Sequence, residues 1–168
     1  MTAWIALLRG VNVGGNNKIP MAELKALCEQ IGLARVRTYI ASGNVIFASD
    51  LGEEAIRTAI ETAIAKKYGK QIGVLVRSGA EMAEAARLCP WPERPGNRVV
   101  ALFIDGPVSL DGVRNQQGER LASGPRAIYI DYGDGMADSK LVLPAGKLGT
   151  ARNMNTVAKL AALAAELG

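Results

Sequence analysis

The residues best suited to chemistry lie in one short loop, between Leu8 and Pro20. The loop carries two cations and three side-chain amides, namely Arg9, Lys18, Asn12, Asn16 and Asn17. Its glycines free backbone N–H groups, and a helix that begins after the loop adds the positive end of its dipole. This chemistry suits an anion. The alternative is that the glycines only turn the chain and the asparagines satisfy the loop's own backbone.

The loop matches no established nucleotide motif. Gly10 and Gly15 have the spacing of a phosphate loop, but asparagines follow where a lysine and a hydroxyl residue are needed. The glycine spacing also differs from the dinucleotide fingerprint. The chain has no histidine and no CxxC pair, which excludes histidine-based triads and the usual zinc sites. We therefore predict no metal and no cofactor.

Two further segments carry polar residues of the same kind. Ser42 and Asn44 flank Gly43 in a predicted hairpin turn, and Arg152 and Asn153 follow Thr150 near the C-terminus. Thr150 is predicted to be the N-cap of the last helix. Arg152 would then oppose the helix dipole in the first turn. A bound anion or a neighbouring carboxylate would remove that conflict, and a solvated arginine is the alternative.

The first half of the chain reads as strand, helix, strand, strand, helix, strand. The predicted elements are a strand at 2–8, a helix at 20–31, strands at 36–41 and 45–48, a helix at 50–69 and a strand at 72–77. Pro20 is expected as the first helical residue, and Asp50 with Glu53 has the spacing of a capping box. This order predicts an α+β fold whose N-terminal lobe, residues 1–77, is ferredoxin-like. The first loop and the turn around Gly43 should then lie at one end of the sheet.

The second half is predicted to repeat part of that order. A helix at 79–88 and a Pro-rich segment form a connector over residues 78–97. A second α+β lobe, residues 98–168, then has strands at 98–104, 126–132 and 139–143 and helices at 110–121 and 152–167. Residues 39–44 resemble residues 129–134. A duplicated lobe and a chance resemblance both remain open.

Composition limits the classes of partner. Lys and Arg total 20 against 16 Asp and Glu, a net charge of +4 that leans toward anionic ligands. No apolar run is long enough for a bilayer, and no signal peptide is recognisable. These features predict a cytoplasmic protein with no membrane partner. Aromatic residues are only 5% of the chain and no RNP1 pattern occurs, which disfavours nucleic acid.

Three segments also carry a family resemblance. Residues 7–15, residues 38–44, and Thr150 to Asn153 with Thr156 and the pair Lys159 and Leu160 closely resemble the signature segments of the bacterial family DUF1697, a domain of unknown function. The resemblance implies a bacterial α+β protein with no established activity. Met154 stands where the family often has tryptophan, which weakens base stacking there. No catalytic residue can be transferred, so whether the protein is an enzyme is left open.

Three functional hypotheses follow. The leading one is a module that binds a phosphate-bearing or other anionic ligand between the two lobes. The ligand-binding residues would be Arg9, Asn12, Asn16, Asn17, Lys18, Ser42, Asn44, Arg152 and Asn153. An alternative is an acylphosphatase-like phosphohydrolase, in which Arg9 cradles phosphate and Asn44 orients water. A further alternative is single-stranded nucleic-acid binding on the sheet, where Phe47 offers one ring.

Overall fold

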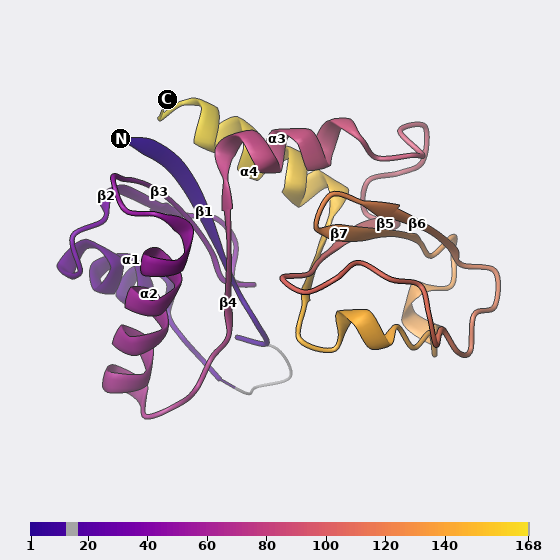
Figure 1. The fold of residues 1–168 in the computed structure, drawn as a ribbon, viewed down its shortest axis with the longest axis horizontal. Helices are drawn as coiled ribbons and strands as arrows, with labels where there is room; N and C mark the ends of the chain where they lie inside the picture. The colour runs from indigo at the N-terminus through magenta and orange to yellow at the C-terminus, as the bar shows by residue number, and fades with distance from the viewer. Residues whose placement is uncertain (13–16, 168) are drawn as a thin grey trace. The chain divides into compact units, whose positions relative to one another are not determined.

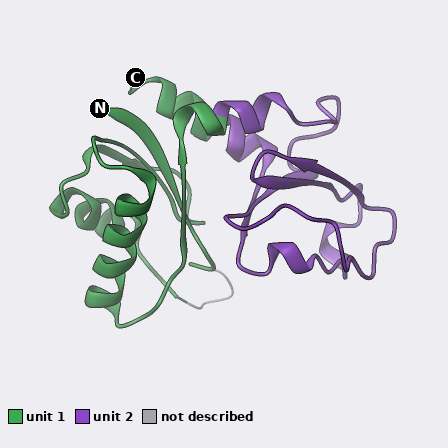
Figure 2. Ribbon diagram, viewed as in Figure 1, with its two compact units in different colours: residues 1–82, 160–168 green, residues 83–159 purple. Residues whose placement is uncertain are grey.

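The computed structural model describes residues 1–12 and 17–167. They form two compact units, coloured separately in Figure 2. Unit 1 consists of Met1–Met82 and Leu160–Gly168, and unit 2 of Ala83–Lys159. Each unit contains one four-stranded antiparallel sheet in its described residues. The α+β class is confirmed.

Unit 1 has its strands and helices in the predicted order (Figure 1). The elements are β1 (Thr2–Leu8), α1 (Met21–Gln30), β2 (Ala34–Thr38), β3 (Asn44–Ser49), α2 (Glu53–Tyr68) and β4 (Val74–Ser78), with sheet order β2-β3-β1-β4. Both β1 and β2 pair antiparallel with β3. They therefore run in the same direction, and the segments that follow them emerge at one end of the sheet.

The hydrophobic core of unit 1 lies between one face of this sheet and helices α1 and α2 (Figure 1). Alternate strand residues such as Leu8, Val45 and Phe47 are fully buried there, together with Ile56 and Ile60 of α2. Alternate strand residues lie on the same face of the sheet, and the i, i+4 stripe of α2 packs against that face.

The helix starts differ from two detailed predictions. Pro20 is the N-cap of α1 rather than its first helical residue, and the N-cap of α2 is Gly52, without a side-chain cap. The predicted capping box of Asp50 and Glu53 is wrong because the helix begins too late for Asp50 to cap it. Asp50 instead lies 3.6 Å from the N-terminal ammonium group. Gly69 ends α2 in the left-handed conformation, with φ 66°.

Unit 2 departs further from the prediction. Its elements, counted from the helix that enters it, are α3 (Gly79–Arg87), β5 (Val99–Phe103), β6 (Arg120–Gly124), β7 (Ala127–Asp131), the 3-10 helices η1 (Met136–Asp138) and η2 (Pro144–Gly146), β8 (Thr150–Asn153) and α4 (Met154–Ala165). The predicted helix at 110–121 is absent from these described residues, because Gly112, Asn115 and Gly118 have positive φ. The predicted strand at 139–143 is reduced to one bridge, Arg114 to Val142.

The two sheets have the same strand order. Unit 1 reads β2-β3-β1-β4 and unit 2 reads β6-β7-β5-β8, so first, second, third and fourth strands occupy equivalent positions. In each, the fourth strand runs directly into a helix, α3 or α4. The resemblance of residues 39–44 to residues 129–134 does not mark this repeat, because it aligns the end of the second strand of one sheet with the end of the third strand of the other.

The unit boundaries differ from the predicted domains, 1–77, 78–97 and 98–168. The division passes through α3 and α4, and the Pro-rich segment 90–96 lies within unit 2. There Arg94 pairs with the buried Asp131 at 3.3 Å, and the N–H of Met154 donates to the carbonyl of Gly96 at 3.0 Å. Among the described residues, no helix has the length and apolar character required to cross a membrane.

The buried thiol of Cys28 gives unit 1 a testable dependence on pH. Burial, with a smaller effect from the charge of Glu29, raises the pKa of Cys28 from 9.0 to about 12. The unfolded chain releases this proton near pH 9 and the folded chain does not, so stability should fall as pH rises above 9, by about 1.4 kcal/mol per pH unit. Urea unfolding at pH 8, 9 and 10 measures this slope. Cys28→Ala should flatten it, and an unchanged slope would contradict the assignment.

Candidate functional site

The first loop and the hairpin turn meet at Asn12. The side-chain amide of Asn12 donates to the carbonyls of Ala41 at 2.7 Å and Ile19 at 3.0 Å. Its Oδ1 accepts the N–H of Ile19 at 2.8 Å. Asn12 has φ 57°, a left-handed conformation that asparagine tolerates better than most residues. One side chain therefore ties the end of β1, the entrance to α1 and the turn after β2, as the topology predicted.

The hairpin turn is closed by buried polar contacts. Asn44 is fully buried, and its amide donates to the carbonyl of Tyr39 at 2.8 Å and to Ser42 Oγ at 3.0 Å. In the first loop, the Asn17 amide donates to the carbonyl of Gly10 at 3.3 Å. These amides satisfy the backbone of their own loops. At these positions the contacts fit the alternative in which the asparagines satisfy the backbone of their own loop.

A pocket of about 370 Å³ lies where the loop, the turn and α1 meet. Its described lining is Asn12, Lys18, Ile19, Pro20, Met21 and Ala41. Four of these lining residues are apolar, and we call them the apolar floor: Ile19, Pro20, Met21 and Ala41. The exposed Lys18 contributes an ammonium group. The N-terminus of α1 has no side-chain cap. Next to Ala41, the β-branched Ile40 has φ 49° and is 48% exposed. Strained residues of this kind concentrate at functional sites.

Arg9 takes a different direction from the pocket. Its N–H donates to the carbonyl of Gly73 at 2.9 Å, and a Cβ placed on Gly73 would lie 3.4 Å from Arg9 Cδ. The side chain therefore packs beside the start of β4, whereas the hairpin lies on the β3 side of β1. Arg9 is not in the described lining of the pocket. The predicted ligand residue Asn16 lies outside the described residues.

The predicted C-terminal site residues belong to unit 2. Arg152 lies in β8 and not in the helix, because β8 pairs with β5 up to Asn153. Arg152 is 7% exposed and donates to Thr150 Oγ1 at 2.7 Å and to the carbonyl of Ala151 at 3.0 Å. Burial lowers its pKa to about 10. The expected conflict with the helix dipole therefore does not arise.

The cap of the last helix is also corrected. Asn153 Oδ1 accepts the N–H of Thr156 at 2.9 Å, so Asn153 caps α4 and the predicted N-cap, Thr150, is the first residue of β8. The helix starts later than expected because the strand extends to its first turn. Asn153 therefore has a structural contact of its own in unit 2.

The sequence interpretation missed the counterpart of Arg152 in unit 1. Arg77 is the second-last residue of β4, as Arg152 is of β8, and it is only 2% exposed. It donates to the carbonyl of Val76 at 2.9 Å. The next residue, Ser78, forms a capping box with Glu81 at the start of α3, with contacts of 3.1 and 2.9 Å. A cation after the apolar run 74–76 was the available signal.

Comparison with known proteins identifies a family and a similar solved structure. The model of the family described as "Protein of unknown function (DUF1697)" matches residues 1–129, which reach into β7 of unit 2. A conserved bacterial protein from Streptococcus pneumoniae, SP0830, has a similar solved structure, with a TM-score of 0.79 and 27% sequence identity. The similarity covers 97% of this chain and 98% of that chain. No curated protein sequence matches.

Proposed function

We propose that this chain, which belongs to the DUF1697 family of proteins of unknown function, is a binding protein that holds a small anionic ligand in the first-unit pocket. The observation that carries the proposal is that Lys18 lines the same pocket as the apolar residues Ile19, Pro20 and Met21, at the start of α1, which has no side-chain cap. An ammonium group and the positive end of a helix dipole favour a phosphate or carboxylate. The apolar floor favours a ligand with a short hydrocarbon part.

The phosphohydrolase alternative has less support from the same geometry. It requires Asn44 to orient an attacking water, but this side chain is fully buried and its amide is engaged with Tyr39 and Ser42. Arg9 lies beside Gly73, on the other side of β1. The nucleic-acid alternative is weakened in a similar way, because Phe47 belongs to the core that α1 and α2 cover and cannot stack on a base.

We further propose that unit 1 is ferredoxin-like and that unit 2 repeats its sheet. The support is that β3 separates β1 from β2, which is the arrangement of a split βαβ motif. The shared strand order, together with Arg77 and Arg152 at equivalent places, supports a duplication in which the helices between strands were lost from unit 2. A bacterial origin is supported by the structural relative, and a cytoplasmic location stays a prediction.

Binding at Lys18 can be tested with butyl phosphate, inorganic phosphate and butanol. Butyl phosphate should bind more tightly than either of the other two, because only it engages both the cation and the apolar floor. At one hundred times its Kd it should stabilise the protein by about 2.7 kcal/mol. Thermal unfolding and calorimetric titration measure these effects.

The matched variants are Lys18→Ala and Lys25→Ala. Both remove one exposed lysine and the same charge, but Lys25 lies on α1 outside the pocket. Lys18→Ala should weaken butyl phosphate binding at least tenfold, while Lys25→Ala should bind as the unmodified protein does. Equal losses of binding in the two variants would show that only the net charge matters, and would reject the site. Release of phosphate from acetyl phosphate would instead support the hydrolase alternative.

A further inference from the structure

A second pocket, of about 690 Å³, lies entirely within unit 2. It is formed by the chain between β5 and β6 and by the segment that follows β7. The lining residues are Asn115, Gln117, Glu119, Tyr132, Gly135, Ala137, Asp138, Ser139 and Lys140. Seven of these nine have polar side chains, unlike the apolar floor of the first-unit pocket. We infer that this pocket binds a small organic amine that also carries hydrogen-bonding groups.

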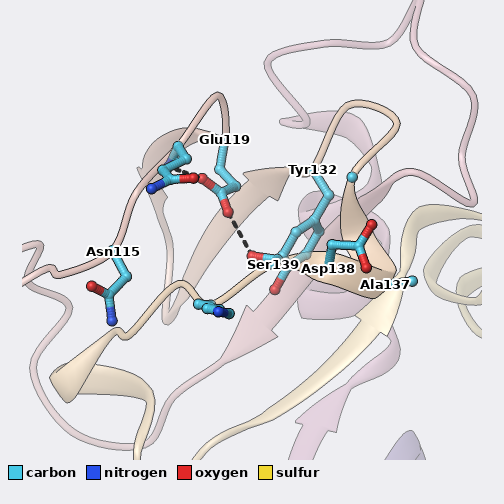
Figure 3. A pocket seen from close by; sticks show the side chains of 9 residues that line it. Asn115, Glu119, Tyr132, Ala137, Asp138 and Ser139 are labelled. Carbon is cyan, nitrogen blue, oxygen red and sulfur yellow. Dashed lines mark hydrogen bonds between the residues drawn. The ribbon is translucent and has the colours of Figure 1, made fainter.

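Glu119 forms the fixed part of the pocket. It is 7% exposed, and Ser139 Oγ donates to its carboxylate at 2.5 Å, as Figure 3 shows. The backbone N–H of Gln117 also donates to it. These hydrogen bonds, that from Ser139 first, hold the pKa of Glu119 below its ordinary value. Ser139 in turn accepts the N–H of Leu141 at 3.3 Å. A permanent negative charge is therefore held at a fixed place between two segments.

Other polar groups of the pocket are not engaged in this way. Within the described chain, no hydrogen bond or ion pair is found for the Asp138 carboxylate, the Tyr132 hydroxyl or the Asn115 amide, and Figure 3 draws all three side chains in the lining of the pocket. The ring of Tyr132 packs on the core of unit 2. Burial, followed by the charge of Glu119, raises the pKa of Tyr132. A neutral phenol is thus retained as a hydrogen-bond donor.

The charges of the lining select the ligand class. Two carboxylates, Glu119 and Asp138, face one ammonium group, Lys140, so the pocket is negative in a chain of net charge +4. In the described part of the chain, no group of three or more His, Cys, Asp or Glu side chains is placed to hold a metal ion. An ammonium group of the ligand can donate hydrogen bonds to the two carboxylates, while its hydroxyl groups pair with Tyr132, Asn115 and Lys140.

The test uses amines matched in shape to neutral molecules. Glucosamine is compared with glucose, and putrescine with butanediol, by following backbone amide signals of the full chain in NMR titrations. At least one amine should shift the signals of residues 115–119 and 135–141, and its neutral partner should bind at least tenfold more weakly. The inference is rejected if neither amine shifts these signals. It is also rejected if glucose binds as tightly as glucosamine and butanediol binds as tightly as putrescine.

Asp138→Asn is the decisive variant, with Asp111→Asn as its control. Both aspartates are exposed and belong to unit 2, but Asp111 does not line the pocket. Asp138→Asn should weaken binding of the amine at least tenfold. The unfolding temperature should not change, because no described contact of the Asp138 carboxylate is lost. Asp111→Asn should have no effect. Equal weakening by the two variants would point to overall charge and reject the pocket. Neither variant touches Lys18, so failure here leaves the first-unit proposal intact.

Discussion

Replacing Gly43 with alanine is expected to destabilise the protein by about 3 kcal/mol. Gly43 has φ +90°, and an added Cβ would lie 2.6 Å from Val11 Cγ2 and 2.9 Å from Leu8 Cβ. Leu8 is held in β1, and its N–H donates to the carbonyl of Gly43 at 2.9 Å. The turn would have to move away from the strand. Urea unfolding with a linear extrapolation measures the change in free energy.

Gly69→Ala separates the two causes of this loss. Gly69 also has a left-handed backbone, φ +66°, but an added Cβ would have no neighbour within 4 Å. Only the conformational penalty applies there, about 1 kcal/mol. The difference between the variants therefore gives the contribution of the clash with Val11 and Leu8. Similar losses in both variants would show that the turn can move aside without a penalty.

Removing the side chain of Asn12 should have an effect of similar size, a loss of about 2–3 kcal/mol in Asn12→Gly. Glycine adopts the native φ without strain, so the loss reports the three hydrogen bonds to Ile19 and Ala41. Asn12→Ala should lose about 1 kcal/mol more because alanine disfavours the left-handed region. Equilibrium unfolding in urea gives both values.

Asn17→Gly provides the control for Asn12. Asn17 also has a positive φ, 49°, but among the described residues its amide makes one exposed contact, of 3.3 Å, to the carbonyl of Gly10. Its removal should change stability by less than about 0.5 kcal/mol. If Asn17→Gly loses as much stability as Asn12→Gly, the hydrogen bonds of Asn12 are not what stabilises the junction of the loop and the turn. Butyl phosphate binding should fall in Asn12→Gly, because Asn12 also positions Lys18 and Ile19 at the pocket.

Together these variants test whether the pocket is a by-product of the scaffold. Asn12 and Gly43 fix the junction of the first loop and the hairpin turn, whereas Lys18 is exposed and lines the pocket. A loss of stability in the first pair without a loss of binding in Lys18→Ala would favour a purely structural loop. A loss of binding in Lys18→Ala would support a ligand site that is held in place by the junction of the loop and the turn.

The sequence alone determined most of unit 1. Apolar runs and periodicity place β1, α1, β2, β3, α2 and β4 in order, because the pattern of each element is local to its own residues. The meeting of Asn12 with the turn follows from that order. What periodicity does not contain is the direction of a single side chain. Arg9 turns toward Gly73 and Asn44 inward, and these directions depend on neighbours distant in sequence.

Tertiary structure decided most of unit 2. Residues 110–121 have an apolar pattern compatible with a helix, but Gly112, Asn115 and Gly118 have positive φ and interrupt it. The segment instead forms a bridge with Val142 and a hydrogen bond with Ser139. The strand β8 replaces the expected first turn of the last helix because β5 offers it an edge to pair with. Hydrogen bonding between strands depends on residues some fifty positions apart. Such pairing leaves no local signal in the residues that form it, so the buried position of Arg152 and the pocket around Glu119 emerged only from the fold.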